Sequence, residues 1–317
     1  MLPTYCPDEK LGRALSSVLE QAAPAAEMQI TVVDDGSPPD LVEELVRSVD
    51  RDGRVEVVRP GERLGLAGNW NRAIALARGE FVHLLHQDDY VLPGFYARIE
   101  QGFRRLPEAG MAFCRTQLVD GEDRFLKNSS RLRWFAGPLQ NWLRVIACRQ
   151  RLQTPAVVVP RATYEQLGGY RTDLCQSLDW EMWVRIAARC PVWYEPRPLA
   201  AYRRHRKNES SRLLASGDVW PDTIRTIMVN AAALPPQMRE GLTAASARWH
   251  AGSALRSAVR RLRSGDVAAA RATLDHVATL IGMAGSASGG GRIQARLRKA
   301  VARTEAAAAA QGRAKTP

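Results

Sequence analysis

The chain has 317 residues, of which 45% are hydrophobic and 25% are charged, which excludes wholesale disorder and a collagen-like structure. No stretch approaches the roughly 20 apolar residues that span a bilayer, and the first residues do not resemble a signal peptide. Five scattered cysteines without a C-x-x-C pair are typical of reduced thiols in the cytoplasm and argue against a disulfide scaffold or a zinc site.

The net charge of +12 is concentrated near the C-terminus. Residues 1–220 carry 30 Lys and Arg against 28 Asp and Glu, whereas residues 221–317 carry 15 against 5, a net charge of +10. A basic segment of this kind indicates contact with phosphate, nucleic acid or an anionic membrane surface. A solvated basic helix surface explains the same charge, so both interpretations stay open.

The first 90 residues alternate predicted strands and helices. Strands are expected at 28–33, 54–58 and 81–85, and helices at 8–21, from Asp40 onward, and at 65–78 with Gly79 as the C-cap. This alternation predicts an α/β fold with a mostly parallel, doubly wound sheet. Ligands of such sheets bind beyond the carboxyl ends of the strands. Because Asp34-Asp35 and Asp88-Asp89 follow two of the strands, we expect them to share one cleft.

The first predicted strand is unusually short. Pro3, Thr4 and Tyr5 have the pattern of a turn after a first strand, yet only two residues precede Pro3. Either the chain has a late start or the sheet lacks half a strand.

The rest of the chain divides into a mixed region and a helical one. Strands are expected at 111–119, 156–159 and 192–202, and helices at 138–148, 179–188, 240–263 and 266–281. The segment 213–221 is predicted to be a linker, and 285–291 is rich in Gly and Ser. We therefore expect a catalytic domain at 1–212 (halves 1–108 and 109–212), a helical appendage at 213–284 and a flexible basic tail at 285–317.

Three acidic groups could carry chemistry. Paired carboxylates directly after a buried strand, as in Asp88-Asp89, suit Mg²⁺ or Mn²⁺ bound to a diphosphate, although an ordinary turn has the same sequence. Asp35 could accept hydrogen bonds from a base or a ribose. Asp179 lies at a predicted helix start, where it is either an N-cap or a firmly held general base. Beside it, Trp180 could stack on a sugar or pack in the core.

Taken in order along residues 1 to 212, these motifs resemble the inverting nucleotide-sugar glycosyltransferases of family 2, which have the GT-A fold. The matching segments are 3–5, 32–37, 65–73, 77–81, 84–89, 167–170, 178–181 and 202–205. No single motif is specific, but the set and its spacing are. The Q-x-x-R-W signature and the membrane helices of processive polymer synthases are missing from this sequence.

The resemblance implies roles for individual residues. The strand-end segment of Pro3, Thr4 and Tyr5 would flank the base, and Asp35 would bind its edge. Asp88 would contact the ribose, and Asp89 would ligate the Mn²⁺ or Mg²⁺ that bridges the diphosphate. The remaining assignments are Asp179 as the catalytic base, Gly168, Gly169 and Trp180 on the acceptor side, and His205 on the metal or the diphosphate, unless it is a surface histidine.

This sequence departs from the family pattern at two places besides the short first strand. His86 stands where many relatives carry a further Asp, which would reduce the acidic cluster to two carboxylates. Gly65 occupies a position where some relatives carry a basic residue toward the nucleotide, and Arg63 is a nearby substitute.

The functional hypothesis is metal-dependent, inverting transfer of a sugar from a nucleoside-diphosphate sugar to an acceptor hydroxyl, in bacterial polysaccharide or glycoconjugate synthesis. The acceptor would be a glycan or a lipid-linked sugar. The protein is expected in the cytoplasm, where the basic tail could hold it on the anionic inner face of the cell membrane. The alternative is an inactive scaffold or nucleotide-binding protein with the same fold. No nucleic-acid partner is expected, because no RNA- or DNA-binding motif is present.

Overall fold

The computed structural model describes residues 1–204, 219–285, 295–296 and 299–306. The chain forms two compact units. Unit 1 comprises Met1–Trp142 and Arg151–Arg206, and unit 2 comprises Leu143–Gln150 and Lys207–Pro317. The sequence placed the first division at residue 212 and did not anticipate that 143–150 would join the C-terminal unit. His205 and most of the predicted linker lie outside the described residues.

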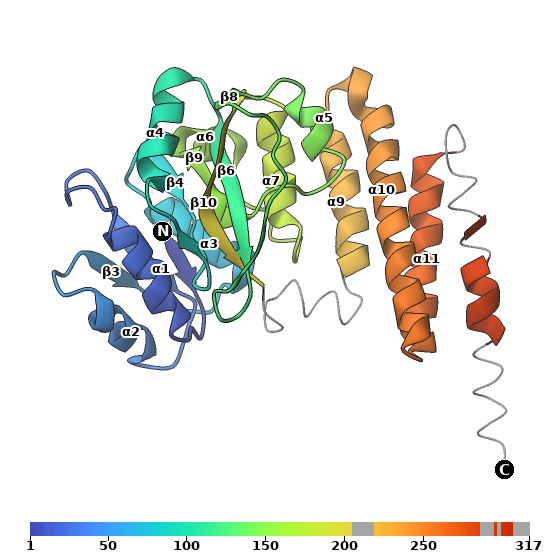
Figure 1. Cartoon of the computed structure of the whole chain (residues 1–317), viewed down its shortest axis with the longest axis horizontal. Coiled ribbons are helices and arrows are strands. Elements are labelled where there is room, and N and C mark those ends of the chain that lie inside the picture. Colours follow the sequence, from blue (N-terminus) through green and yellow to red (C-terminus); the bar gives the residue numbers. More distant parts are fainter. Residues whose placement is uncertain (205–218, 286–294, 297–298, 307–317) are drawn as a thin grey trace, which may run out of the picture. The chain divides into compact units, whose positions relative to one another are not determined.

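The first sheet of unit 1 is parallel and has the strand order β1-β2-β3, with β3 at its edge (Figure 1). Its strands are β1 (Leu2–Thr4), β2 (Ile30–Asp34) and β3 (Val55–Val58). Although β1 has only three residues, all three are buried and pair with β2. On its other side, the Met1 amino group donates to the His83 carbonyl (3.0 Å), and Leu85 N–H donates to the Met1 carbonyl (3.1 Å). The short first strand is therefore fully integrated between its neighbours.

The second sheet is mixed, with the order β4-β9-β6-β10-β5, and β7 and β8 pair at its margins. Strands β6 and β10 run parallel, and the other pairs are antiparallel. The bounds are β4 (Phe81–His83), β5 (Tyr90–Val91), β6 (Met111–Val119), β7 (Phe125–Asn128), β8 (Gly137–Pro138), β9 (Val157–Pro160) and β10 (Val192–Arg203). The predicted α/β fold class is confirmed. All strand pairs of the first sheet are parallel, whereas the second sheet is mixed.

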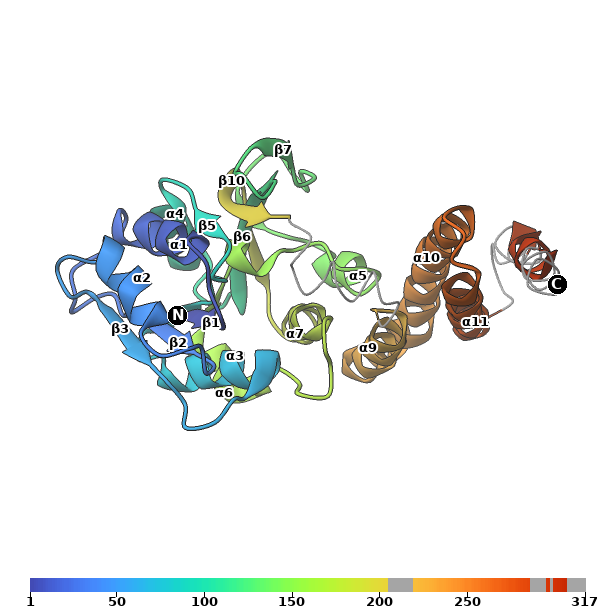
Figure 2. The ribbon, with the colours of Figure 1, turned by 90° about the horizontal axis from the view of Figure 1, so that it is seen from below.

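Helices cover both faces of the sheets in unit 1. Figure 2 shows α1 and α4 on one side of the strands and α3 and α6 on the other. The bounds are α1 (Lys10–Leu19), α2 (Leu41–Val49), α3 (Gly65–Leu76), α4 (Phe95–Arg105), α6 (Arg161–Leu167) and α7 (Leu178–Ala187), with a short 3₁₀ turn at Thr154–Ala156. In α1 the spacing of Leu11, Leu15 and Val18 gives one apolar stripe, which is buried against the sheet.

Two predicted helices differ from those observed. The α3 helix ends at Leu76 because Ala77 is extended and Arg78 N–H donates to the Gln29 side chain (2.9 Å), so Gly79 is not its C-cap. The helix predicted at 138–148 is reduced to α5 (Trp142–Ile146), because Pro138 pairs with Trp193 in the sheet.

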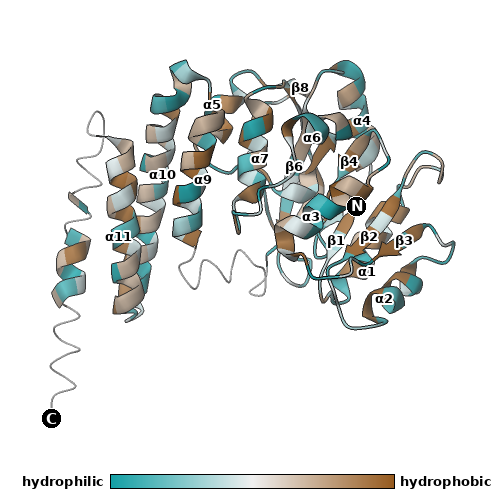
Figure 3. Cartoon of the chain, turned by 180° about the vertical axis from the view of Figure 1, so that it is seen from behind, coloured by the Kyte–Doolittle hydropathy of each residue, from teal (hydrophilic) through white to brown (hydrophobic). Residues whose placement is uncertain are grey.

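Unit 2 is helical, as the sequence predicted. It contains α9 (Val219–Ala233), α10 (Pro236–Arg263) and α11 (Val267–Ala284), and Figure 3 shows polar and apolar residues alternating around α10 and α11. The side chain of Asp266 caps α11 by accepting from Ala269 N–H (3.2 Å). The α9 helix was not predicted, and its first residues had been assigned to the linker. No helix in the described part of the chain is long and apolar enough to cross a membrane.

The buried side chain of His83 makes the free energy of unfolding depend on pH. His83 Nε2–H donates to the Pro155 carbonyl (3.0 Å), so its Nδ1 accepts from the Tyr96 hydroxyl (3.2 Å). Burial, followed by the positive amino terminus, lowers the pKa of His83 to about 3. Between pH 6.5 and about 3, the unfolded chain therefore binds a proton that the folded chain does not.

We expect the free energy of unfolding to fall on acidification below pH 6.5, by at most about 1.4 kcal/mol per pH unit from this one group. The His83→Gln variant should lose less stability over the same window, whatever its stability at pH 7. Urea unfolding at pH 7.0 and 5.5 measures both differences. An identical pH dependence in the two proteins would contradict this assignment.

Candidate functional site

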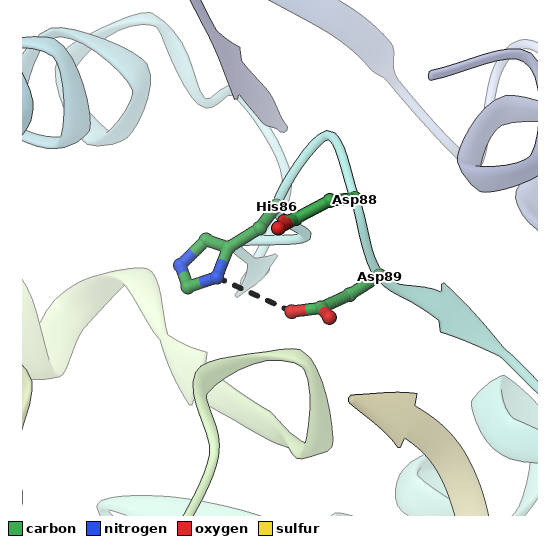
Figure 4. A group of neighbouring side chains, drawn as sticks. All are labelled: His86, Asp88 and Asp89. Atoms are coloured by element: carbon green, nitrogen blue, oxygen red, sulfur yellow. Dashed lines mark ion pairs between the residues drawn. The ribbon is translucent and has the colours of Figure 1, made fainter. Parts of the chain in front are cut away.

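Three side chains that could bind a cation meet in the loop between β4 and β5. His86, Asp88 and Asp89 each place a ligand atom within 4.8 Å of the others. Figure 4 shows the His86 ring directed toward Asp89, with Asp88 on the same loop. From the sequence, the two carboxylates were expected here and His86 was interpreted as a missing carboxylate. In the structure, the His86 imidazole is the third potential ligand of the cluster.

Asp89 is the most deeply buried member, with an exposed fraction of 1%. Its Oδ1 accepts the backbone N–H of Arg203 (2.8 Å), and its Oδ2 lies 3.3 Å from His86 Nδ1. Burial, followed by the charge of Asp88, raises the pKa of Asp89 to about 6. Burial also disfavours the charged imidazole, but the hydrogen bond to Asp89 and the charges of Asp89, Asp88 and Asp179 outweigh it and raise the pKa of His86.

Arg203, at the end of β10, holds this loop in place. Besides the backbone bond to Asp89, its Nε donates to the Asp88 carbonyl (2.9 Å), and its guanidinium forms an ion pair with Asp123 (2.8 Å). The guanidinium also lies over the Tyr90 ring, 5.7 Å from the centroid. With a side chain only 3% exposed, Arg203 fixes both carboxylate residues from behind.

The cluster has the chemistry of a divalent cation site. Carboxylate oxygens suit Mg²⁺ and Mn²⁺, whereas an imidazole nitrogen is more typical of transition metals. Among the described residues, the buried Asp89 Oδ2 has no hydrogen-bond donor other than the facing His86 ring, and His86 Nε2 is likewise buried without a partner there. Two carboxylates and one imidazole therefore fit Mn²⁺ at least as well as Mg²⁺.

The loop that follows β1 lies directly beside this cluster. Tyr5 exchanges two hydrogen bonds with the Gln87 side chain: Tyr5 N–H donates to Oε1 (2.8 Å), and Nε2 donates to the Tyr5 carbonyl (3.1 Å). The Tyr5 ring is 40% exposed, and the Arg63 guanidinium lies 3.8 Å from its centroid. Pro3 and Thr4 are buried within β1. A planar ring beside a cation is thus placed next to the acidic cluster.

Asp35 lies between the start of α3 and Arg63, the residue that contacts the Tyr5 ring. Its carboxylate accepts the N–H groups of Leu64 (2.7 Å) and Gly65 (2.9 Å), and Arg63 Nε lies 3.9 Å away. Asp35 therefore satisfies the unpaired amides at the start of α3 from outside the helix. Gly65 has a φ of +71°, which disfavours a side chain there, and the cation of this region is Arg63.

Asp179 faces the same side of unit 1. It lies in the first turn of α7, whose N-cap is Ser177 rather than Asp179, and its Oδ1 accepts from Trp180 N–H (2.6 Å). Its negative charge contributes to the raised pKa values of His86 and Tyr170, so it lies within electrostatic range of both. Three elements far apart in sequence therefore converge here.

The Gly168-Gly169 loop is held from two sides. From α7, Arg185 donates to the carbonyls of Leu167 (2.6 Å), Gly168 (3.2 Å) and Gly169 (2.8 Å) while paired with Glu181. From α3, Asn71 exchanges two hydrogen bonds with the Tyr170 backbone (2.7 and 2.8 Å). A Cβ on Gly169 would lie 2.3 Å from Asn71 Oδ1, so this close approach requires glycine.

The remaining predicted site residues have different outcomes. Trp180 is 2% exposed, so in this structure it packs in the core and offers no face to a sugar. His205 is outside the described residues. Sequence reasoning missed the positioning roles of Gln87, Asn71, Arg185 and Arg203. Each acts through backbone groups distant in sequence. Gln87, Asn71 and Arg203 lie inside family-like motifs, which was their one signal, and Arg185 lies outside them.

The fold of unit 1, with acidic loops at its strand ends, is the arrangement expected of the GT-A fold, and the comparisons with known proteins agree. Residues 1–156 match the family model "Glycosyl transferase family 2". Among solved structures, S. aureus TarS 1–349 in complex with UDP-GlcNAc has a TM-score of 0.68 at 17% identity, covering 96% of this chain and 87% of that one. Its complex with UDP gives a TM-score of 0.64 at 16% identity, over 97% and 87% of the two chains.

Two curated relatives were also found. An uncharacterized protein of Mycobacterium tuberculosis is 28% identical over 237 residues, 68% of this chain and 69% of the relative. The succinoglycan biosynthesis protein ExoU of Rhizobium meliloti is 34% identical over 86 residues, which is 27% of this chain and 24% of the relative. Residues 1–156 therefore form a glycosyltransferase family 2 domain, and the protein is a glycosyltransferase.

The capping role of Asp35 can be tested apart from any ligand. The Asp35→Ala variant leaves two amides at the start of α3 without an acceptor, so we expect the free energy of unfolding to fall by about 1–3 kcal/mol in the absence of nucleotide. Urea unfolding of wild type, Asp35→Ala and Asp35→Asn measures this, and Asn should cost less because its carbonyl still accepts one bond. Unchanged stability in Asp35→Ala would refute the capping role.

Proposed function

We propose that this glycosyltransferase moves a sugar from a nucleoside-diphosphate sugar to an acceptor hydroxyl, with inversion and with the help of Mn²⁺ or Mg²⁺. The observation that carries the proposal is the convergence of the His86-Asp88-Asp89 cluster with Asp179. A cation site and a candidate base lie close enough for the charge of Asp179 to act on His86.

The donor would bind across the first sheet and the acidic cluster. The partly exposed ring of Tyr5, backed by Arg63, suits stacking on a planar base. Asp35 is already held by two amides, but a carboxylate has further lone pairs with which to meet a base edge. Asp88 would contact the ribose and Asp89 the cation, as the family resemblance implies. The complexes of TarS with UDP and UDP-GlcNAc make uridine nucleotides the first candidates.

The chemistry needs one base and compensation of charge on the leaving group. Asp179 would remove the proton from the attacking hydroxyl, and it lies in the first turn of α7, where the helix dipole favours a negative charge. A divalent cation held by Asp89 and His86 would supply Lewis-acid stabilisation of the departing diphosphate. Inversion follows because a single displacement involves no covalent sugar-enzyme intermediate.

The acceptor would approach past the Gly168-Gly169 loop, which Arg185 and Asn71 hold rigidly. Such fixed backbone is suited to positioning a hydroxyl near a base. The similarity to a succinoglycan biosynthesis protein favours polysaccharide or glycoconjugate synthesis, with a glycan or lipid-linked acceptor. The net charge of +10 over residues 221–317 would add attraction to an anionic membrane surface.

The donor site is tested by calorimetric titration of UDP, dTDP and GDP with and without Mn²⁺. We expect metal-dependent binding of one nucleotide, weakened at least about tenfold in Asp89→Asn, because the amide keeps an acceptor for Arg203 but loses the charge that binds the cation. Glu100→Gln removes a surface carboxylate from α4 and should bind as wild type does. Equal nucleotide affinity with and without Mn²⁺ would refute metal dependence.

The base is tested by Asp179→Asn. Loss of the base should lower the rate of transfer about 10²–10⁴-fold while leaving nucleotide affinity nearly unchanged. Asp173→Asn, which alters an exposed carboxylate in the preceding loop, is the matched control and should transfer normally. Release of nucleoside diphosphate in the presence of acceptor measures the rate, and a normal rate in Asp179→Asn would rule out this role.

A further inference from the structure

An exposed apolar segment comprises β7 and the loop that follows it toward β8, and none of its residues has been assigned to the site. We define the apolar strap as Phe125–Phe135. Four of its large apolar side chains are at least half exposed: Phe125 (58%), Leu126 (50%), Trp134 (75%) and Phe135 (77%). Single exposed apolar residues are ordinary, but four within 11 residues mark an interaction surface.

The backbone of the strap is held firmly although its side chains face solvent. Ser129 N–H donates to the Thr116 carbonyl (2.8 Å), and the Ser129 carbonyl accepts two bonds from Arg115 (3.0 and 2.7 Å). Further along, Leu132 N–H donates to the Tyr194 hydroxyl (3.2 Å). Figure 2 shows β7 at the outer margin of unit 1. The strap is thus a preformed surface, not a loose loop.

The charges of the strap have one sign. Lys127, Arg131 and Arg133 are its charged residues, and it contains no Asp or Glu. The Arg131 guanidinium lies over the Trp134 ring, 4.2 Å from the centroid. Aromatic and aliphatic side chains interleaved with cations suit the interface of an anionic bilayer, where rings enter the headgroup region and cations meet lipid phosphates.

Other occupants match this surface less well. Residues 221–317 of the same chain carry a net charge of +10, so that part of this chain or of a second copy would be repelled by the three cations. A glycan would call for carboxylate and amide groups beside the rings, and Asn128 is the one amide in the strap.

The strap is also connected to the acidic cluster. Asp123, two residues before Phe125, forms the ion pair with Arg203, whose Nε donates to the Asp88 carbonyl. A surface bound at Phe125 and Leu126 would therefore adjoin the loop that carries the carboxylates. We propose that the apolar strap docks unit 1 on an anionic lipid surface, so that the cluster works close to the membrane. The orientation toward a lipid-linked acceptor rests on the proposed function, whereas the docking does not.

The docking is tested by flotation of the full chain with vesicles of phosphatidylcholine containing 30 mol% phosphatidylglycerol, in 50 mM and 500 mM NaCl. We expect binding that weakens in high salt and in vesicles of phosphatidylcholine alone. The double variant Trp134→Ser/Phe135→Ser should lower the partition constant at least about tenfold, because two rings no longer enter the interface. Met228→Ser changes an equally exposed apolar residue of α9 (63% exposed) and should bind as wild type does.

A second readout does not depend on the folding of the serine variant. Lipids brominated in the acyl chains should quench tryptophan fluorescence of wild type more than that of Trp134→Phe. Without vesicles, the two proteins should show no difference in quenching. Nucleotide binding without lipid is measured separately, so a failed donor site and a failed docking surface are distinguishable. Two results would overturn the docking: equal partitioning of wild type and the serine variant, or a change from dimer to monomer in that variant, which would show that a second copy covers the strap.

Discussion

The arrangement of the site depends on the contacts of Arg203 at the end of β10. A carboxylate as buried as Asp89 is costly unless its oxygens are matched by donors, and the Arg203 backbone N–H provides one of them. The guanidinium of the same residue fixes the Asp88 carbonyl and reaches Asp123. One residue therefore joins the second sheet, the loop after β4 and the turn before β7, and the geometry of the cluster follows from the register of β10 beside β6.

Reciprocal hydrogen bonds from two side-chain amides, one in a loop and one in α3, hold the rest of the site. Gln87 exchanges two bonds with the Tyr5 backbone, and Asn71 exchanges two with that of Tyr170. A side-chain amide is suited to this because it both donates and accepts, like a peptide group. Loops connected in this way need no long strand behind them, which is why a three-residue β1 is sufficient to place Tyr5 beside the cluster.

The sequence predicted the elements whose signals are local. The strand at 111–119 was placed correctly, and that at 192–202 to within one residue, because long apolar runs have a clear periodicity. The end of α3 was misplaced because Gln29, 49 residues away, binds Arg78 N–H. His86 was interpreted as a missing carboxylate because its role depends on Asp89 and on Trp70, whose ring stacks at 4.9 Å. Contacts between distant segments leave no periodic trace in one sequence.

The two pairs of neighbouring aspartates, Asp34-Asp35 and Asp88-Asp89, have different roles although their sequences look alike. Asp34 is fully buried and paired with Arg59 (2.9 Å), and Asp35 caps α3, so both serve the fold whether or not a ligand is bound. In the second pair, Asp89 has one oxygen matched by an amide, and within the part of the chain that the structure describes the other faces only an imidazole. The raised pKa of Asp89 reflects this incomplete compensation. A divalent cation would supply the missing positive charge, because it interacts with the ionised carboxylate and leaves the imidazole neutral. The same burial that disfavours the ionised carboxylate would therefore favour the cation proposed to bind here.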